Sequence, residues 1–320
     1  MDDKRAKLCD EKTLTDWCSL CSFYSNNFSN EKVEWTFRGE NPESTEGDLF
    51  HIPQWAFKSR LVEDFDRFGI QDANVRSLIE QRLIRHFRRK APIHTGDRSE
   101  NWLECLALIQ HYEGPTRMLD WTYSFFAAVY FAINRAKVNR GGKIQGVVWA
   151  LDSTWLADED EKFEGEFIDK HTKNNSADKL KALKADGRDQ FENRVIHSFI
   201  TNRLADSETE CAWPPFVYAV NPYYLNERLS SQQGVLICPS RIDMPWSTNL
   251  QSMLRKSQQE GDARVHLWKI QIECGTVEMQ MEFLKRLLEM NISQASLFPD
   301  LEGLAKSLRI WMIKPYIMRA

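Results

Sequence analysis

The stretch QHYEGPTRMLDWTYSFFAAVYFA, residues 110–132, decides the fold, because a dense polar segment runs directly into an apolar block. His111, Glu113, Arg117 and Asp120 all fall in its first half. Charged groups so close to a core need partners inside the protein, or they need a ligand. The apolar block is nonpolar nearly all round, which predicts a helix buried at the centre of the molecule.

The neighbouring elements follow from local signals. Thr122 or Ser124 can cap the buried helix, and the segment before it, residues 116–122, is short and β-like. A further helix is expected over about residues 100–112, and Gly114 with Pro115 ends it.

Strands and helices are both expected elsewhere. EKVEWTFRGE, residues 31–40, alternates apolar and polar residues, which predicts a short strand closed by Gly39. Apolar runs typical of strands lie at 146–151, 216–220, 234–239 and 267–272. Helical patterns lie within 1–30, over 61–89 with a break in 69–75, over 277–290, and after Pro299.

We therefore expect an α+β fold in one mixed domain, with a helical N-terminal extension over residues 1–30. Residues 158–190 are polar and charged, which predicts an exposed helical insertion or lid.

Composition limits the classes of function. The chain has 320 residues, 42% of them hydrophobic, and a formal charge of −4, so no overall field favours nucleic acid or an anionic membrane. The basic stretch 82–90 fits a solvated helix face, although a nucleic-acid contact there stays open. The longest apolar run, residues 125–133, is about half of what a bilayer span needs.

Seven Cys are scattered along the chain. The opening MDDKRAKLCDEK is charged where a secretory signal has an apolar core, so we expect a cytoplasmic protein with reduced thiols. Cys18 and Cys21 have zinc-like spacing, but no second pair of ligands is evident, and no metal site is expected.

Three separate segments carry candidate site residues. Arg38 before Gly39 suits recognition of a phosphate or carboxylate, and a salt bridge with Glu40 is the alternative. Asp120 lies between apolar neighbours and needs hydrogen-bond donors if it is buried. Gln232 precedes an apolar strand, where an amide can bind hydroxyls or a base edge, or can belong to an ordinary polar loop.

FRG at 37–39, QHYEGPTRMLDWT at 110–122, AAVYFA at 127–132, RLSSQQGVLI at 228–237 and LFPDLEGLA at 297–305 together resemble the FRG domain. The resemblance runs in order over about residues 30–310, and it implies an FRG domain over 31–320 with an insertion at 158–190. Relatives are known mainly from bacterial and phage proteins in settings of toxin or phage defence. The family usually has Gly-Leu before the Pro, where this chain has Glu113-Gly114.

A weaker resemblance is to ADP-ribosyltransferases of the Arg–Ser–Glu type. TFRG, LDWTYSFFAAVYFA and QQGVLICP match their three elements in order. This resemblance implies a strongly bent or split central sheet with flanking helices, and NAD as substrate. In the third element Gln232 and Gly234 stand where the family has Glu. Because a carboxylate stabilises the oxocarbenium-like centre at the ribose, its loss typically costs about 10²–10³ in rate.

The candidate roles are assigned accordingly. Asp120, Gln232 and Glu113 are the candidates for catalysis. The candidates for ligand binding are Arg38, Gly39, His111, Tyr112, Thr116, Arg117, Trp121, Thr122, Arg228, Gln233 and Gly234.

Two functions stay open. The first is an enzyme of a toxin or defence system that performs ADP-ribosyl transfer or NAD glycohydrolysis on an unidentified macromolecular target. The second is a non-catalytic module that senses a ligand or holds a protein in the same cleft.

Overall fold

The computed structural model describes residues 7–30, 32–41, 52–53, 56–95, 101–139, 142–171, 187–201, 213–220 and 227–309. It is an α+β structure built around one seven-stranded sheet, in the order β1-β7-β4-β2-β3-β6-β5. The strands are β1 (Asp10–Leu14), β2 (Trp35–Glu40), β3 (Leu119–Thr122), β4 (Ile144–Asp152), β5 (Val217–Val220), β6 (Gly234–Pro239) and β7 (Leu267–Gly275). Among the strands that the structure describes, β1 and β7 alone pair in parallel, and the other neighbours are antiparallel.

The sheet is continuous but narrows between β2 and β3. One residue pair, Phe37 with Thr122, joins the two strands. By contrast, β2 pairs with β4 over six residues, from Trp35 to Glu40. We call this one-pair connection the sheet joint. It separates a half-sheet of β1, β7, β4 and β2 from a half-sheet of β3, β6 and β5.

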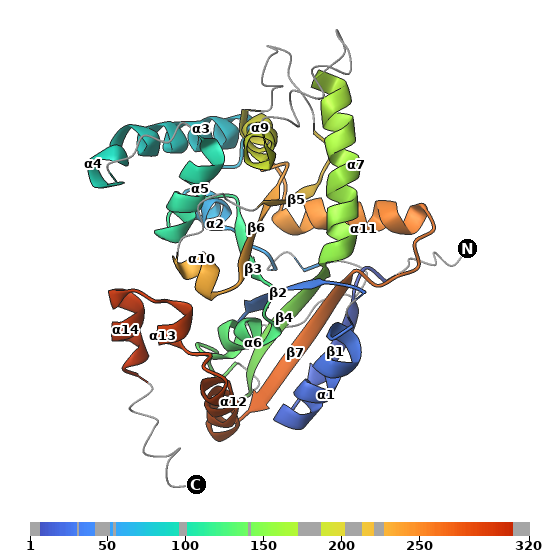
Figure 1. Cartoon of the computed structure of the whole chain (residues 1–320), viewed down its shortest axis with the longest axis vertical. Coiled ribbons are helices and arrows are strands. Elements are labelled where there is room, and N and C mark those ends of the chain that lie inside the picture. Colours follow the sequence, from blue (N-terminus) through green and yellow to red (C-terminus); the bar gives the residue numbers. More distant parts are fainter. Residues whose placement is uncertain are drawn as a thin grey trace.

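Helices pack against both half-sheets (Figure 1). Around β4 and β7 lie α1 (Trp17–Phe28), α6 (Phe125–Ile133) and α12 (Val277–Glu289). Near β5 and β6 lie α3 (Ala73–Lys90), α5 (Trp102–His111), α7 (Ser153–His171), α9 (Arg188–Thr201) and α11 (Trp246–Gln259). The shorter helices are α2 (Arg60–Arg67), α4 (Pro92–Thr95), α10 (Glu227–Ser231), α13 (Gln294–Leu297) and α14 (Leu301–Ser307).

The core lies on both faces of the sheet. Along β4, Val147, Trp149 and Leu151 join one apolar cluster, whereas Val148 and Ala150 join the other. Both clusters are completely enclosed here, which explains why β4 reads as a continuous apolar run and not as an alternating one.

Helix α6 lies directly on β2 and β4, because glycines face it. A Cβ atom on Gly39 would overlap the carbonyl oxygen of Ala128, and one on Gly146 would overlap that of Ala132. The helix is capped by Ser124, whose hydroxyl accepts from the amide of Ala127 at 3.3 Å. The buried helix predicted from residues 125–133 is thereby confirmed.

Most predicted elements are confirmed, including the strands in the four apolar runs and the break between α2 and α3. The N-terminal part contains the expected helix, α1, and in addition β1, which forms the edge of the main sheet. One expectation is wrong. The described part of the charged insertion is not an exposed excursion, because Phe163 and Phe167 of α7 are buried in the core.

Candidate functional site

A hollow of about 280 Å³ opens beside the sheet joint. We call it the polar cleft. It is lined by Phe37, Arg38, Gly39, Glu113, Asp120, Trp121, Thr122, Tyr130, Phe131, Asn134, Arg135, Arg228, Gln232, Gln294, Phe298 and Lys306. The three segments near positions 38, 120 and 232, far apart in the sequence, therefore border one cavity.

Arg38 bridges the two half-sheets. Its Nη1 donates to the backbone carbonyl of Asp120 at 2.7 Å, and its Nε donates to Glu40 at 2.9 Å. Beyond the sheet joint the β2–β3 ladder stops, so the guanidinium satisfies a carbonyl that a strand partner would otherwise satisfy. The Arg38–Glu40 salt bridge considered from the sequence is present, and Arg38 also lines the cleft.

Glu40 holds Arg38 from behind. Its carboxylate also accepts from the backbone amide of Phe57 and from the indole of Trp149, both at 3.2 Å. Because three donors fix this carboxylate, the guanidinium is preorganised and loses little freedom when it binds an anion.

Asp120 is held by a chain of two side chains, of which sequence reasoning missed Gln110 and assigned Thr116 to ligand binding; Thr116 is buried, does not line the cleft and positions Gln110 instead. The amide nitrogen of Gln110 donates to Oδ2 of Asp120 at 2.7 Å, and the Thr116 hydroxyl donates to the amide oxygen of Gln110. Gln110 and Thr116 are buried. Among the described residues, Oδ1 of Asp120 has no hydrogen-bond partner, so this oxygen is available to a ligand in the cleft.

Arg228 forms the opposite wall. Its Nη1 donates to the carbonyl of His111 at 3.2 Å and lies 3.8 Å from the carboxylate of Glu113. Its guanidinium carbon lies 4.6 Å from the ring centre of Phe298, a cation–π contact. Glu113 has a φ of 60°, a left-handed conformation that turns the chain after α5, and it also pairs with Arg60 at 3.5 Å.

The loop before β6 contributes Gln232, whose amide donates to the carbonyl of Leu297 at 2.9 Å. Its backbone carbonyl accepts from the Thr122 hydroxyl at 2.6 Å. Gly234 lies against Leu229, and a Cβ there would overlap that side chain. The carbonyl of Gln233, at a φ of 48°, accepts from the amide of Tyr123. Thr122 and Gln233 thus tie β3 to this loop.

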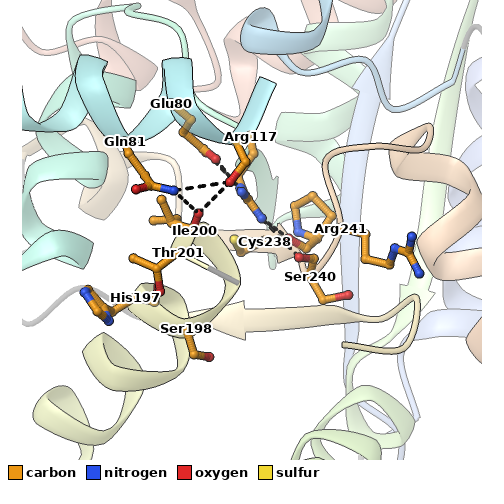
Figure 2. A network of polar contacts seen from close by, with 12 residues as sticks. Glu80, Gln81, Arg117, His197, Ser198, Ile200, Thr201, Cys238, Ser240 and Arg241 are labelled. Carbon is orange, nitrogen blue, oxygen red and sulfur yellow. Dashed lines mark hydrogen bonds and ion pairs between the residues drawn. The ribbon is translucent and has the colours of Figure 1, made fainter. Parts of the chain in front are cut away.

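Arg117 does not reach the cleft. It is fully buried and forms a two-point ion pair with Glu80 of α3, and its Nη1 donates to the carbonyls of Pro239 and Ser240 (Figure 2). All these contacts are internal, so Arg117 joins α3 to the end of β6 and is not positioned to bind a ligand.

Three other residues that the sequence suggested for ligand binding, Trp121, Tyr112 and His111, also lie outside the cavity or point away from it. The Trp121 ring packs between Phe57 and Trp246, with ring centres 5.5 and 6.4 Å away, and its side chain is buried. Tyr112 is 70% exposed and does not line the cleft. His111 lies behind Arg228 in a small adjoining hollow, and burial, followed by the charge of Arg228, lowers its pKa.

Sequence reasoning also missed half of the wall, which comes from helices. Tyr130, Asn134 and Arg135 come from α6 and the turn after it; Gln294 and Lys306 belong to α13 and α14. Burial raises the pKa of Tyr130 to about 12, so its hydroxyl stays protonated. One signal in the sequence could have placed Tyr130 and Asn134 together in the wall: they are four residues apart, so they share a face of a helix.

The cleft carries more positive than negative charge. Arg38, Arg135, Arg228 and Lys306 face Asp120 and Glu113. In the part of the chain that the structure describes, no group of three His, Cys, Asp or Glu side chains could hold a metal ion. No helix there combines the length and apolar character needed to cross a bilayer.

The fold and the site define an α+β protein with a cation-rich cleft where two half-sheets meet. The family model of the FRG domain matches residues 52–140, so the chain carries an FRG domain. Neither a curated protein nor a solved structure matches the chain. The matched segment contains Glu113, Asp120 and the α6 residues of the cleft, whereas Arg38, Arg228 and Gln232 lie outside it.

Proposed function

We propose that the polar cleft binds a nucleotide of the NAD type and that Asp120 acts on its ribose. The observation that carries this proposal is the convergence of Arg38, Asp120 and Gln232 on one cavity with four cations and two acids. Arg side chains provide two-point, charge-assisted hydrogen bonds to phosphate oxygens. A fixed carboxylate beside them would stabilise the positive charge that develops on the ribose when its glycosidic bond breaks.

The proposed step breaks the bond between C1′ of the ribose and the nicotinamide nitrogen. The bonding electron pair leaves with nicotinamide, which becomes neutral. A water oxygen, or a nucleophile of a target molecule, then bonds to C1′ and transfers its proton to Asp120. Oδ1 of Asp120 is the oxygen without a partner among the described residues, and Gln110 holds the other oxygen.

A second candidate function is binding without turnover, and the residues at β6 favour it. Gln232 supplies an amide whose nitrogen is already bound to Leu297, and Gly234 supplies no side chain. The site then has no carboxylate from this strand, and the cleft would sense a nucleotide instead of cleaving it. A role in toxin action or phage defence would require a cellular target if the protein is an enzyme. It would require a partner that responds to the bound state if the protein is a sensor.

Incubation of the purified chain with labelled NAD, with and without cell lysate, separates the two. Release of nicotinamide or transfer of label, lost in Asp120→Asn at unchanged melting temperature, supports the enzyme. Saturable binding without turnover supports the sensor. Arg38→Lys, which keeps the charge but loses the two-point geometry, should weaken binding about tenfold or more. Absence of both binding and turnover in the wild-type chain would refute the nucleotide proposal.

A further inference from the structure

A second, larger hollow adjoins the polar cleft. It encloses about 490 Å³ between α6, α12, α13 and α14. We call it the apolar groove, because most of the surface that its lining residues expose to it is apolar. The apolar lining residues are Val277, Met281, Leu284, Leu288, Ile292 and Ala295.

The two hollows share a polar wall. Tyr130, Asn134, Arg135, Gln294 and Lys306 line both of them. The Tyr130 hydroxyl donates to the amide oxygen of Gln294 at 3.4 Å, which links α6 to α13 at this wall. A ligand long enough to occupy both hollows must therefore pass over two cations and two amides.

The cations of the shared wall are available to an anion. Arg135 is exposed, and among the described residues it has neither a hydrogen bond nor an ion pair. The ion pair of Lys306 is with Glu302, one turn away on its own helix, where such pairs contribute little. Phosphate oxygens can replace that partner, because charge-assisted hydrogen bonds to phosphate are stronger than an exposed surface pair.

Size and polarity set the class of ligand. The polar cleft alone lies just below the roughly 300–1,000 Å³ of ordinary ligand pockets. Together with the apolar groove it falls well inside that range. The three regions follow one another in space. The polar cleft suits a ribose, the cationic shared wall suits a diphosphate, and the apolar groove suits a planar base. Met281 suits the last, because its flexible thioether adapts to flat ring faces.

Building on the nucleotide-binding function proposed above, we propose that the two hollows together hold one dinucleotide. Its reactive ribose lies in the polar cleft, its diphosphate crosses the shared wall at Arg135 and Lys306, and its second base occupies the apolar groove.

Calorimetry with ADP-ribose and ribose 5-phosphate tests this arrangement, since both probes lack the cleavable nicotinamide bond. ADP-ribose should bind the wild-type chain at least about tenfold more tightly than ribose 5-phosphate. Ala295→Trp and Val277→Trp fill the groove from two sides, and each should remove this advantage while leaving the affinity for ribose 5-phosphate unchanged. Val277 is 45% exposed, so a larger side chain there should be tolerated even if Ala295→Trp unfolds the chain.

Met279→Trp is the matched control. Met279 lies in the same turn of α12 as Val277, is 38% exposed and lines neither hollow, so this variant should bind both probes as the wild type does. Equal affinities for the two probes, or groove variants that keep the advantage, would overturn the dinucleotide proposal while leaving nucleotide binding intact. Binding of neither probe would overturn both.

Discussion

At the scale of single residues, Gly39 has a structural role that its place beside Arg38 concealed. From the sequence, Gly39 was a ligand-binding candidate beside Arg38, which suits a phosphate or a carboxylate. The structure shows that the backbone of α6 approaches it, at Ala128 and Ala132. Gly39 thereby sets the distance between α6, which carries Tyr130, and β2, which carries Arg38.

We expect Gly39→Ala to destabilise the protein by about 3 kcal/mol or to prevent folding, because the new methyl group would overlap main-chain atoms that cannot rotate away. Urea unfolding measures the effect. Gly165→Ala is the control, since nothing lies within 4 Å of a Cβ at that helical position. It should be neutral or stabilising by up to about 1 kcal/mol. Similar behaviour of the two variants would contradict the close packing of α6.

The candidate site was predictable where charged residues interrupt apolar sequence. Arg38 and Asp120 stand out for that reason, and both line the cleft. Arg117 stands out equally but is paired internally with Glu80, 37 positions away, and a sequence does not show which buried charge has a partner. Lys306 and Arg135 look like ordinary surface cations in the sequence. They reach the same wall only because α14 packs on α13, and α13 is linked to α6 through Gln294 and Tyr130.

At the scale of elements, strands with apolar runs or with regular alternation were predictable, and the polar edge strand β1 was not. β4 to β7 carry continuous or nearly continuous apolar sequence, as buried strands do. β1 reads DEKTL and pairs with one neighbour only, so a helical pattern over Leu14 to Cys21 obscured it. α7 was misjudged for a related reason: its many acids suggest solvent, but its burial depends on Phe163 and Phe167.

The contact between α5 and α9 should make stability depend on pH. His197 packs against Trp102 with ring centres 4.8 Å apart, and burial, followed by the charge of Arg88, lowers its pKa below the ordinary 6.5. The unfolded chain then binds a proton more readily than the folded one. Stability is therefore complete above about 6.5 and declines as the pH falls through the unfolded and then the folded pKa.

His197→Phe keeps a ring in this contact but cannot take up a proton. We expect the free energy of unfolding to fall less for this variant than for the wild type between about pH 7 and about pH 5. Parallel pH profiles from denaturant titrations would show instead that His197 titrates alike in both states.

At the scale of the whole molecule, the sheet joint places the cleft between two half-sheets. One apolar cluster spans both half-sheets, and the other covers the opposite face of the half that contains β1, β7, β4 and β2. One residue pair and the side chain of Arg38 connect the halves at this point. The matched FRG segment, residues 52–140, supplies β3 and α6 and so contributes to both halves.

A ligand that touches both walls should slow local opening at the joint. We expect NAD to reduce amide hydrogen exchange at Phe37 and Thr122, because opening there would break ligand contacts as well as the single strand pair. Exchange in the centre of the β4–β7 ladder serves as the internal reference and should not change. Equal exchange at the joint with and without bound NAD would mean that the ligand contacts one half only.

The sealed ion pair of Arg117 and Glu80 and the open cations of the cleft will respond differently to dissolved salt. Counterions cannot enter a site where both side chains are at most 2% exposed, so this link between α3 and β6 has the same strength at high salt concentration as in dilute buffer. Arg135 faces water, and the field it presents to an approaching anion shrinks as the Debye length shortens. This buried link is thus insensitive to ionic strength whereas the entrance of the cleft is sensitive to it, so added salt would weaken the capture of an anion without loosening the join between α3 and β6.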